Sequence, residues 1–490
     1  MLIIPFIINA QTFKKVYTFE KSTIPIISIE TNDGYIIGNF IYNGNVHNIR
    51  YKFNSNLIKL DKYGNIKKQI NIDNNYIDCI QEIWTINDTT YGALSVFAEE
   101  DSSKFKVCYF QFNNNLEISI KDTLYFKDSI AGVNGLKHIA SDLYIDKNNN
   151  TVCTISLYPF HPLKYQLLIM KINNKGKILK YNSFLPESDE YYITTNKQGG
   201  YYLIKGCFAN ELYTMDSNLN EFKRDFYIPD DWNNLEDDLI YAVGTQWKND
   251  TILTVFTTDG YDHNFQMGYY ELTIINGECK EKNYYYRFPF KDPDELAAEY
   301  NAVDKFGDYT FFAARTNVFL YSDNVRDTNA TRIIKLNKNN SVVWDKIYDF
   351  NAWHWAMTIT ATKDGGCLVA GTETCFTCPE NIGNLYVLKI DSTGYAEGAD
   401  ITDNISQKPH YTADITIYPN PGNNTINMQL PDNINNAELS IFNISGKMII
   451  SKHLNNGLNT VSTDNLKSGI YFYRIITNGK VLSKGKWVKE

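Results

Sequence analysis

Two stretches near the end of the repetitive part of the chain decide its fold. Residues 364–373 read DGGCLVAGTE, and residues 385–394 read LYVLKIDSTG. The first stretch is a turn followed by an apolar strand, and the second is an apolar strand that runs into a polar turn. Asp-Gly and Gly-Gly supply the positive φ angles that a tight hairpin needs. The pair therefore predicts neighbouring antiparallel strands, each with one buried face.

The same two signals alternate seven times along the chain. The turn-then-strand signal occurs at residues 32–40, 87–97, 148–158, 198–207, 249–257, 307–316 and 364–373. The strand-then-turn signal occurs at residues 57–64, 108–115, 168–176, 211–218, 269–277, 332–339 and 385–394. The spacing is about 55 residues, which suits a four-stranded blade. No repeat contains a helical period long enough to compete.

Seven such units predict an all-β chain in which residues 11–395 form a seven-bladed β-propeller, a fold that hides its sheet edges by radial closure. The seventh unit lacks a good fourth strand. Phe13-Lys14-Lys15-Val16-Tyr17 resembles the last strand of the sixth unit, Trp344-Asp345-Lys346-Ile347-Tyr348. We therefore expect residues near 12–20 to complete the last blade and close the ring.

The strand-then-turn series resembles the repeats of secreted bacterial propellers, including quinoprotein-like folds. The named subfamilies match poorly. The chain has one Trp-Asp pair, Trp344-Asp345, instead of one per blade, and it lacks the Ser-x-Asp-x-Gly-x-Thr-Trp box of sialidase-like propellers. These departures count against glycosidase and quinoprotein functions.

Composition and the first residues indicate the compartment. The net charge of -9 argues against a nucleic-acid binder, and no stretch approaches 18 consecutive apolar residues, so no transmembrane segment is expected. Residues 1–10, MLIIPFIINA, read as a signal peptide cleaved after Ala10. The usual charged n-region is missing, so the start is expected to be truncated. The alternative is a buried N-terminal strand.

Eight cysteines in 490 residues are too few for a disulfide scaffold. Cys375 and Cys378 form a CxxC motif, for which a local disulfide or structural thiols are the favoured interpretation. A metal site would need two more ligands, and no second CxxC or HxxxH motif supplies them. No metal site is therefore predicted.

The repeat stops near residue 395, and residues 396–413 read as a linker. Residues 414–490 contain short alternating strands separated by Ser-Gly-Lys, Lys-Ser-Gly and Asn-Gly-Lys turns about every ten residues, which is typical of a small antiparallel, immunoglobulin-like β-sandwich.

Residues 414–490 also closely resemble the type A C-terminal sorting domain of the type IX (Por) secretion system of Bacteroidetes. The motif residues are Tyr418, Pro419, Asn420, Pro421, Gly446, Lys447, Gly469, Tyr471, Gly479, Lys480 and Lys486. The resemblance implies export across the inner membrane, then recognition by the secretion machinery, with the protein released or held at the cell surface. The alternative is an ordinary ligand-binding accessory module.

The sequence contains little recognisable chemistry. It has no HExxH, GxSxG, P-loop or dinucleotide motif, and no cofactor is identified. Acidic stretches at 230–238 and 292–295 offer oxygen ligands for structural calcium, although solvated loop charge is the favoured interpretation. Trp353, His354 and Trp355, which we expect in a connection between blades, are the candidate ligand-binding residues. Core packing is the favoured alternative for the two tryptophans.

Two classes of function remain open. The first is a non-enzymatic scaffold that binds an extracellular glycan, peptide or protein. The alternative is a hydrolase or lyase with its site at the channel mouth. Two acidic residues and one His or Tyr from different blades facing the channel would favour the enzyme, and a channel lined by aromatic and amide side chains would favour binding.

Overall fold

The computed structural model describes most of the chain as β-strands joined by turns. The described residues are 11–42, 53–72, 77–98, 105–126, 141–146, 148–157, 166–184, 191–196, 199–206, 211–226, 239–260, 265–276, 278–288, 295–316, 329–349, 353–374, 383–403, 417–430, 437–443, 447–477 and 480–490. Within them every regular element is a strand, so the predicted all-β class is confirmed. None of these described residues forms a helix that could span a membrane.

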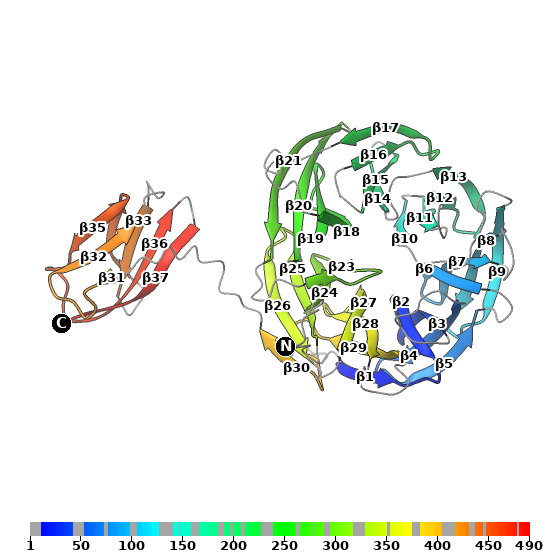
Figure 1. The fold of residues 1–490 in the computed structure, drawn as a ribbon, viewed down its shortest axis with the longest axis horizontal. Coiled ribbons are helices and arrows are strands. Elements are labelled where there is room, and N and C mark those ends of the chain that lie inside the picture. Colours follow the sequence, from blue (N-terminus) through cyan, green and yellow to red (C-terminus); the bar gives the residue numbers. More distant parts are fainter. Residues whose placement is uncertain are drawn as a thin grey trace, which may run out of the picture. The chain divides into compact units, whose positions relative to one another are not determined.

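Contacts divide the chain into two units, Met1–Asn404 and Ile405–Glu490. The described residues of the first unit form seven sheets (Figure 1). Five of them are four-stranded and take consecutive strands in chain order. The first two contain β2 (Ser22–Thr31), β3 (Gly34–Tyr42), β4 (Phe53–Asp61) and β5 (Ile66–Asn71), then β6 (Ile77–Asn87), β7 (Thr90–Ala98), β8 (Phe105–Asn113) and β9 (Ile118–Phe126).

The next three sheets follow the same order. They contain β10 (Ser141–Ile145), β11 (Thr151–Leu157), β12 (Gln166–Ile172) and β13 (Ile178–Phe184); β14 (Tyr191–Thr195), β15 (Tyr201–Lys205), β16 (Glu211–Met215) and β17 (Glu221–Phe226); and β18 (Leu239–Trp247), β19 (Ile252–Gly260), β20 (Gln266–Ile275) and β21 (Glu278–Arg287).

The sixth sheet departs from the simple pattern. Both β22 (Glu295–Ala297) and β23 (Val303–Phe306) pair with β24 (Tyr309–Thr316), which is followed by β25 (Thr331–Asn337), β26 (Val342–Asp349) and β30 (Asp400–Asp403). Strand β30 lies within the expected linker 396–413. Its four residues pair with β26 instead of remaining irregular.

The seventh sheet combines the two ends of the first unit. It contains β27 (Trp353–Ala361), β28 (Cys367–Thr374), β29 (Gly383–Ile390) and the N-terminal strand β1 (Phe13–Tyr17). Strand β1 pairs antiparallel with β29, with Phe13 opposite Lys389 and Tyr17 opposite Leu385. The prediction that residues near 12–20 supply the missing strand of the last unit is confirmed.

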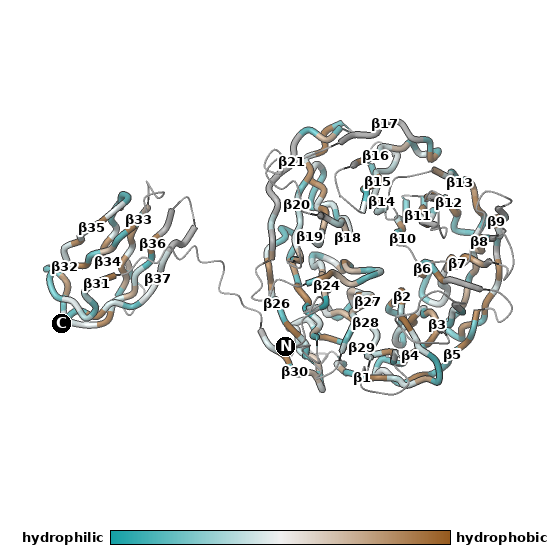
Figure 2. Tube along the Cα trace, in the orientation of Figure 1, coloured by the Kyte–Doolittle hydropathy of each residue, from teal (hydrophilic) through white to brown (hydrophobic). Residues whose placement is uncertain are grey.

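Each sheet of the first unit packs against the next one. The contacting strands include β2 and β6, β6 and β10, β10 and β14, β14 and β18, β19 and β22, and β24 and β27, and β2 of the first sheet contacts β27, β28 and β29 of the last. The first strands of the sheets surround a common centre (Figure 1). Hydrophobic residues recur along the strands (Figure 2), and one core cluster joins the first sheet to the last.

A side-chain hydrogen bond explains the polar turn that follows the third strand of six of the seven sheets, and also the turn between β10 and β11. Asp61 Oδ1 accepts hydrogen bonds from the backbone N–H of Tyr63 at 2.9 Å and Asn65 at 2.8 Å, and Gly64 adopts φ 74°. Slight desolvation opposes ionisation of Asp61, but the bonds from Asn65 lower its pKa to about 2. The equivalent first turn residues are Asn113, Asp146, Asn173, Asp216, Asn337 and Asp391. An Asp or Asn side chain at the first position is therefore the shared feature of these turns, whereas a glycine three residues later is not present in all of them.

Lysines that precede these turns join neighbouring sheets. Lys59 is 5% exposed, and its Nζ lies 2.8 Å from the Asp33 carboxylate and 3.1 Å from the carbonyl oxygen of Asn114 in the next sheet. Lys335 is 3% exposed and donates to the carbonyl oxygens of Gly365 at 2.8 Å and Ser392 at 3.0 Å. The lysine of the repeat is thus a buried connection between sheets, because a buried ammonium needs such partners.

The second unit consists of two antiparallel sheets in its described residues. One contains β31 (Ile417–Tyr418), β32 (Thr425–Leu430) and β35 (Gly457–Ser462), and the other contains β34 (Met448–Leu454), β33 (Ala437–Phe442), β36 (Gly469–Thr477) and β37 (Lys480–Lys489), in that order. Their core includes the fully buried Leu439, Ile475 and Trp487. Alternation of buried and exposed residues along β36 gives this sheet one inner face and one outer face.

Candidate functional site

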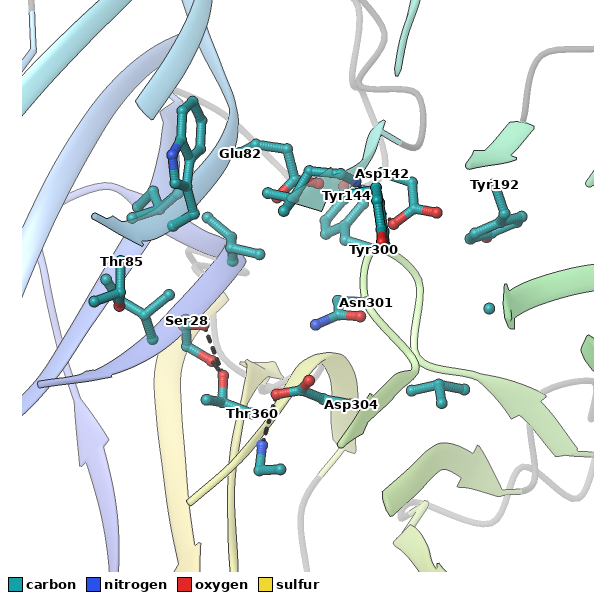
Figure 3. A pocket seen from close by; sticks show the side chains of 18 of the residues that line it. Ser28, Glu82, Thr85, Asp142, Tyr144, Tyr192, Tyr300, Asn301, Asp304 and Thr360 are labelled. Carbon is teal, nitrogen blue, oxygen red and sulfur yellow. Dashed lines mark hydrogen bonds between the residues drawn. The ribbon is translucent and has the colours of Figure 1, made fainter. Parts of the chain in front are cut away.

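A cavity of about 470 Å³ lies at the centre of the first unit (Figure 3). Residues from all seven sheets line it, and they come from β2, β6, β10, β14, β18 and β27, from the turn after β27, and from β23 and the segment before it. They include Ser28, Glu30, Glu82, Trp84, Thr85, Asp142, Tyr144, Tyr192, Thr194, Thr245, Tyr300, Asn301, Asp304, Thr360 and Lys363. A volume of this size is typical of a small-molecule or oligosaccharide site.

The lining carries an excess of acidic groups. The carboxylates of Glu30, Glu82, Asp142 and Asp304 come from four different sheets, and Lys363 is the one cationic side chain among the described lining residues. Four carboxylates in one cavity give it a negative potential and many hydrogen-bond acceptors.

Asp142 joins the third sheet to the fourth. Its Oδ1 accepts a hydrogen bond from the N–H of Leu143 at 2.9 Å, and its Oδ2 accepts one from the N–H of Ile193 at 2.8 Å. Burial raises the pKa of Asp142 to about 7, and the two backbone hydrogen bonds oppose that shift. The carboxyl group is therefore placed to change charge near neutral pH.

Asp304 repeats this arrangement between the sixth and seventh sheets. It accepts hydrogen bonds from the N–H of Lys305 at 2.7 Å and of Ala361 at 2.8 Å. Burial raises the pKa of Asp304 to about 6, although the bond from Ala361 opposes the shift. Two carboxyl groups with raised pKa values thus face one cavity from different sheets (Figure 3).

The seam between the last and first sheets also borders the cavity. Thr360 Oγ1 donates to the carbonyl oxygen of Ser28 at 2.7 Å, and the two side-chain hydroxyls lie 2.6 Å apart. The Glu30 carboxylate accepts a hydrogen bond from the N–H of Lys363 at 2.9 Å. These bonds fix the positions of the hydroxyl and carboxylate groups that a ligand would meet.

A segment between β22 and β23 carries Tyr300 and Asn301 into the lining. The Tyr300 N–H donates to the carbonyl oxygen of Met357 at 2.9 Å, and Asn301 Nδ2 donates to that of Ile359 at 2.9 Å. The Tyr300 ring meets Phe40 of the first sheet edge-on at 6.4 Å. Further aromatic side chains come from Trp84, Tyr144, Tyr192 and Phe306. Aromatic faces beside acceptor groups suit a ligand with apolar C–H faces and hydroxyl donors.

The sequence-predicted trio occupies β27, not a connection between sheets. His354 is fully buried, its Nε2 lies 2.7 Å from a carboxylate oxygen of Glu373, and its ring packs edge-on against Tyr386 at 4.8 Å. The Trp355 ring lies 4.6 Å from the guanidinium carbon of Arg315. Neither these two residues nor Trp353 lines the cavity. Their ligand-binding role remains a prediction.

Of the acidic stretches, the signal peptide and the CxxC motif predicted from the sequence, the structure describes only Glu295. Glu295, the last residue of the acidic stretch 292–295, is fully buried, and it lies 2.6 Å from Arg332 Nη1. Burial raises the pKa of Glu295 to about 7 despite this pairing. The rest of that stretch, the stretch 230–238, the signal peptide 1–10, Cys375 and Cys378 lie outside the described residues. Among the described residues no group of three metal-binding side chains forms.

The structure brings the two ends of the tail motif together. Asn420 Nδ2 donates to the carbonyl oxygen of Lys486 at 2.8 Å, and Asn420 Oδ1 accepts from the N–H of Val488 at 3.0 Å. The carbonyl oxygen of Pro419 accepts a hydrogen bond from the indole N–H of the buried Trp487 at 2.8 Å. The Tyr-Pro-Asn-Pro segment, with cis bonds before Pro419 and Pro421, thus holds the terminal strand in place.

The remaining motif residues lie on other strands and turns of the second unit. Gly469 begins β36, and the hydroxyl of the buried Tyr471 donates to the carbonyl oxygen of Lys467 at 2.8 Å. Lys447 and Lys486 are exposed, and the N–H of Lys447 donates to Asn443 Oδ1 at 2.9 Å. Gly446, Gly479 and the side chain of Lys480 lie outside the described residues.

Residues 416–490 match the family model of the secretion system C-terminal sorting domain. The tail is therefore the type IX (Por) sorting domain that its sequence predicts, and the protein is exported to the cell surface or the extracellular space. No curated protein matches the sequence.

The solved structures that this chain matches share little sequence with it. The α-L-arabinofuranosidase Arb93A from Fusarium graminearum is 10% identical, with a TM-score of 0.38 over 65% of this chain and 98% of its own. The polysaccharide lyase Uly1 is 9% identical, with a TM-score of 0.40 over 74% and 89%. The N-terminal domain of Nup159 is 8% identical, with a TM-score of 0.34 over 77% and 95%.

Proposed function

We propose that residues 11–395 form a seven-bladed β-propeller and that residues 414–490 form an immunoglobulin-like sandwich. The first proposal is supported by the order of the sheets, by the contacts of the last sheet with the first, and by the pairing of β1 with β29. Radial closure of this kind leaves few exposed sheet edges, which suits a protein that leaves the cell. Residues 1–10 would serve as its signal peptide.

We propose further that the exported propeller binds a glycan in its central cavity. The observation that carries this proposal is the joint presence of four carboxyl groups and five aromatic side chains in a cavity lined by all seven sheets. Carboxylates accept hydrogen bonds from sugar hydroxyls, and aromatic rings cover the apolar faces of sugar rings. The cavity of about 470 Å³ fits a short oligosaccharide.

A glycan-array screen with the purified full chain tests this function. We expect binding to a defined group of oligosaccharides, with loss of binding in Glu82→Gln and Tyr300→Ala variants. Tyr125→Ala is a matched control, because Tyr125 is an exposed aromatic residue on β9 that does not line the cavity. Wild-type binding by both Glu82→Gln and Tyr300→Ala would contradict the proposal.

A hydrolase or lyase acting in the same cavity is the second candidate. Asp142 and Asp304 come from different sheets, their pKa values are raised to about 7 and about 6, and tyrosines share the cavity. Carboxyl groups with pKa values near the working pH are suited to general acid catalysis. Against this, both oxygens of each group already accept backbone hydrogen bonds, so a role in joining sheets accounts for them.

Incubation with the bound oligosaccharides separates the two candidates. Release of new reducing ends or of unsaturated products would identify an enzyme, and Asp304→Asn should then abolish release while binding persists. Binding without any product after prolonged incubation would leave the non-enzymatic scaffold as the function.

A further inference from the structure

The outer face of one sheet in the second unit is unusually apolar. Strand pairing places Met448, Phe442 and Phe472 in one row across β34, β33 and β36. Ile470 lies two residues before Phe472 on β36. Directly paired residues of an antiparallel sheet project from the same face. Met448 is 52% exposed, Phe472 is 48% exposed and Ile470 is 45% exposed. We name these four residues the outer apolar patch.

The outer apolar patch lies opposite the core of the unit. Residues that alternate with it along β36 and β33 are buried, namely Tyr471, Ile475, Leu439 and Ile441. The inward residues therefore already supply the core, and the patch adds nothing to it. Large apolar residues gathered on a soluble surface mark an interaction site more often than chance.

Basic residues border the patch. Lys486 is paired with Phe472 across β36 and β37, and the Arg474 guanidinium lies 5.5 Å from the centre of the Phe442 ring. Both basic side chains are exposed. Residues 416–490 contain eight Lys and Arg against four Asp and Glu, a net charge of +4 in a chain whose total is -9. A partner for this face must therefore present acidic groups around an apolar surface.

We propose that the outer apolar patch, with Arg474 and Lys486, is the surface by which an acidic, apolar protein of the export machinery recognises the sorting domain. The proposal rests on the sorting role of residues 416–490 and adds the face and the chemistry of recognition. Apolar contact supplies the affinity, and the basic border orients the partner and accelerates encounter.

Export of full-length variants in a bacterium that carries the type IX machinery tests the proposal. The Met448→Gln and Phe472→Gln double variant should accumulate in the periplasm, with a fall in exported protein of about fivefold or more. Arg474→Glu, which reverses a border charge and keeps all four patch residues, should also lower export. Leu458→Gln is the matched control, because Leu458 is 61% exposed and lies on β35 of the opposite sheet.

Three results would overturn the proposal. Normal export of both the double variant and Arg474→Glu would exclude the face as a recognition surface. A fall in export of Leu458→Gln as large as that of the double variant would show that the effect is not specific to the outer apolar patch. Loss of a wild-type dimer in the double variant, seen by light scattering, would assign the face to a second copy of the chain.

Truncation separates this proposal from the sorting role itself. A stop codon in place of residue 414 removes the whole domain and should strand the protein in the periplasm. If the truncated chain is still exported, the sorting role fails. If it is stranded while the double variant is exported normally, the sorting role holds and only the proposed face is wrong. Thermal unfolding of the purified variants checks that the domain remains folded.

Discussion

Thr360 Oγ1 donates a hydrogen bond of 2.7 Å to the carbonyl oxygen of Ser28, across 332 residues of sequence. The bond joins β27 of the last sheet to β2 of the first and is fully shielded from solvent. It is a buried polar link at the place where the two ends of the repeat region meet. The stability of the first unit should therefore depend on this pair.

Removing the Thr360 hydroxyl tests that dependence. Thr360→Val leaves the Ser28 hydroxyl and carbonyl without their partner, and we expect a loss of about 1–3 kcal/mol in the free energy of unfolding, measured by urea denaturation. Thr360→Ser keeps the hydroxyl and should lose much less. Equal stability of Thr360→Val and the wild type would show that the seam does not need this bond.

Deleting residues 11–21 removes β1, which pairs along its whole length with β29. The deletion exposes the outer edge of the last sheet and uncovers the core cluster that includes Phe13. We expect a lower midpoint in a thermal melt followed by circular dichroism. A truncated chain as stable as the wild type would contradict closure of the ring by the N-terminal strand.

Lys335 offers a test of the connections between sheets. Lys335→Met keeps the length of the side chain but leaves the carbonyl oxygens of Gly365 and Ser392 without their donor. We expect a loss of about 2–4 kcal/mol in unfolding free energy, since each unsatisfied buried group costs about 1–3 kcal/mol. Lys338→Met, three residues away and exposed, is the control and should be close to the wild type.

The pH dependence of stability should report the Asp142 carboxyl group. Its pKa is raised from 3.8 to about 7 in the folded protein, so the folded state holds this proton more tightly than the unfolded state. The resulting stabilisation is full below about pH 4 and is lost as the pH rises through 7. The free-energy difference between wild type and Asp142→Asn should therefore shift against the wild type between pH 4 and 7.

Much of the fold could be predicted from local chemistry. Asp61 and Gly64 are close in sequence, and the hydrogen bonds that fix their turn involve neighbours only, so the pattern is visible without a structure. The strand at 13–17 was predictable because it resembles the last strand of the sixth unit. The strand β30 was not, because its four residues, Asp-Ile-Thr-Asp, are specified by pairing with β26 instead of by their own pattern.

The candidate site was much less visible in the sequence. Asp142 lies on β10 and Asp304 lies on β23, and each of these strands precedes a hairpin turn. The two residues face the same cavity only because strands from all seven sheets surround it. Their separation of 162 residues carries no motif. The sequence indicates Trp353, His354 and Trp355 as candidates because tryptophan is rare in the chain. In the structure these residues lie on β27, and the His354 side chain is buried in the core. An alignment of the strand that precedes each turn would have identified the lining residues.

Glycan binding by the full-length protein shows whether the central cavity is the functional site. We predict that the wild type binds a defined group of oligosaccharides, that Glu82→Gln and Tyr300→Ala lose this binding, and that Tyr125→Ala retains it. The absence of any bound oligosaccharide, or equal binding by Tyr300→Ala and the wild type, would contradict the assignment of the central cavity as the functional site.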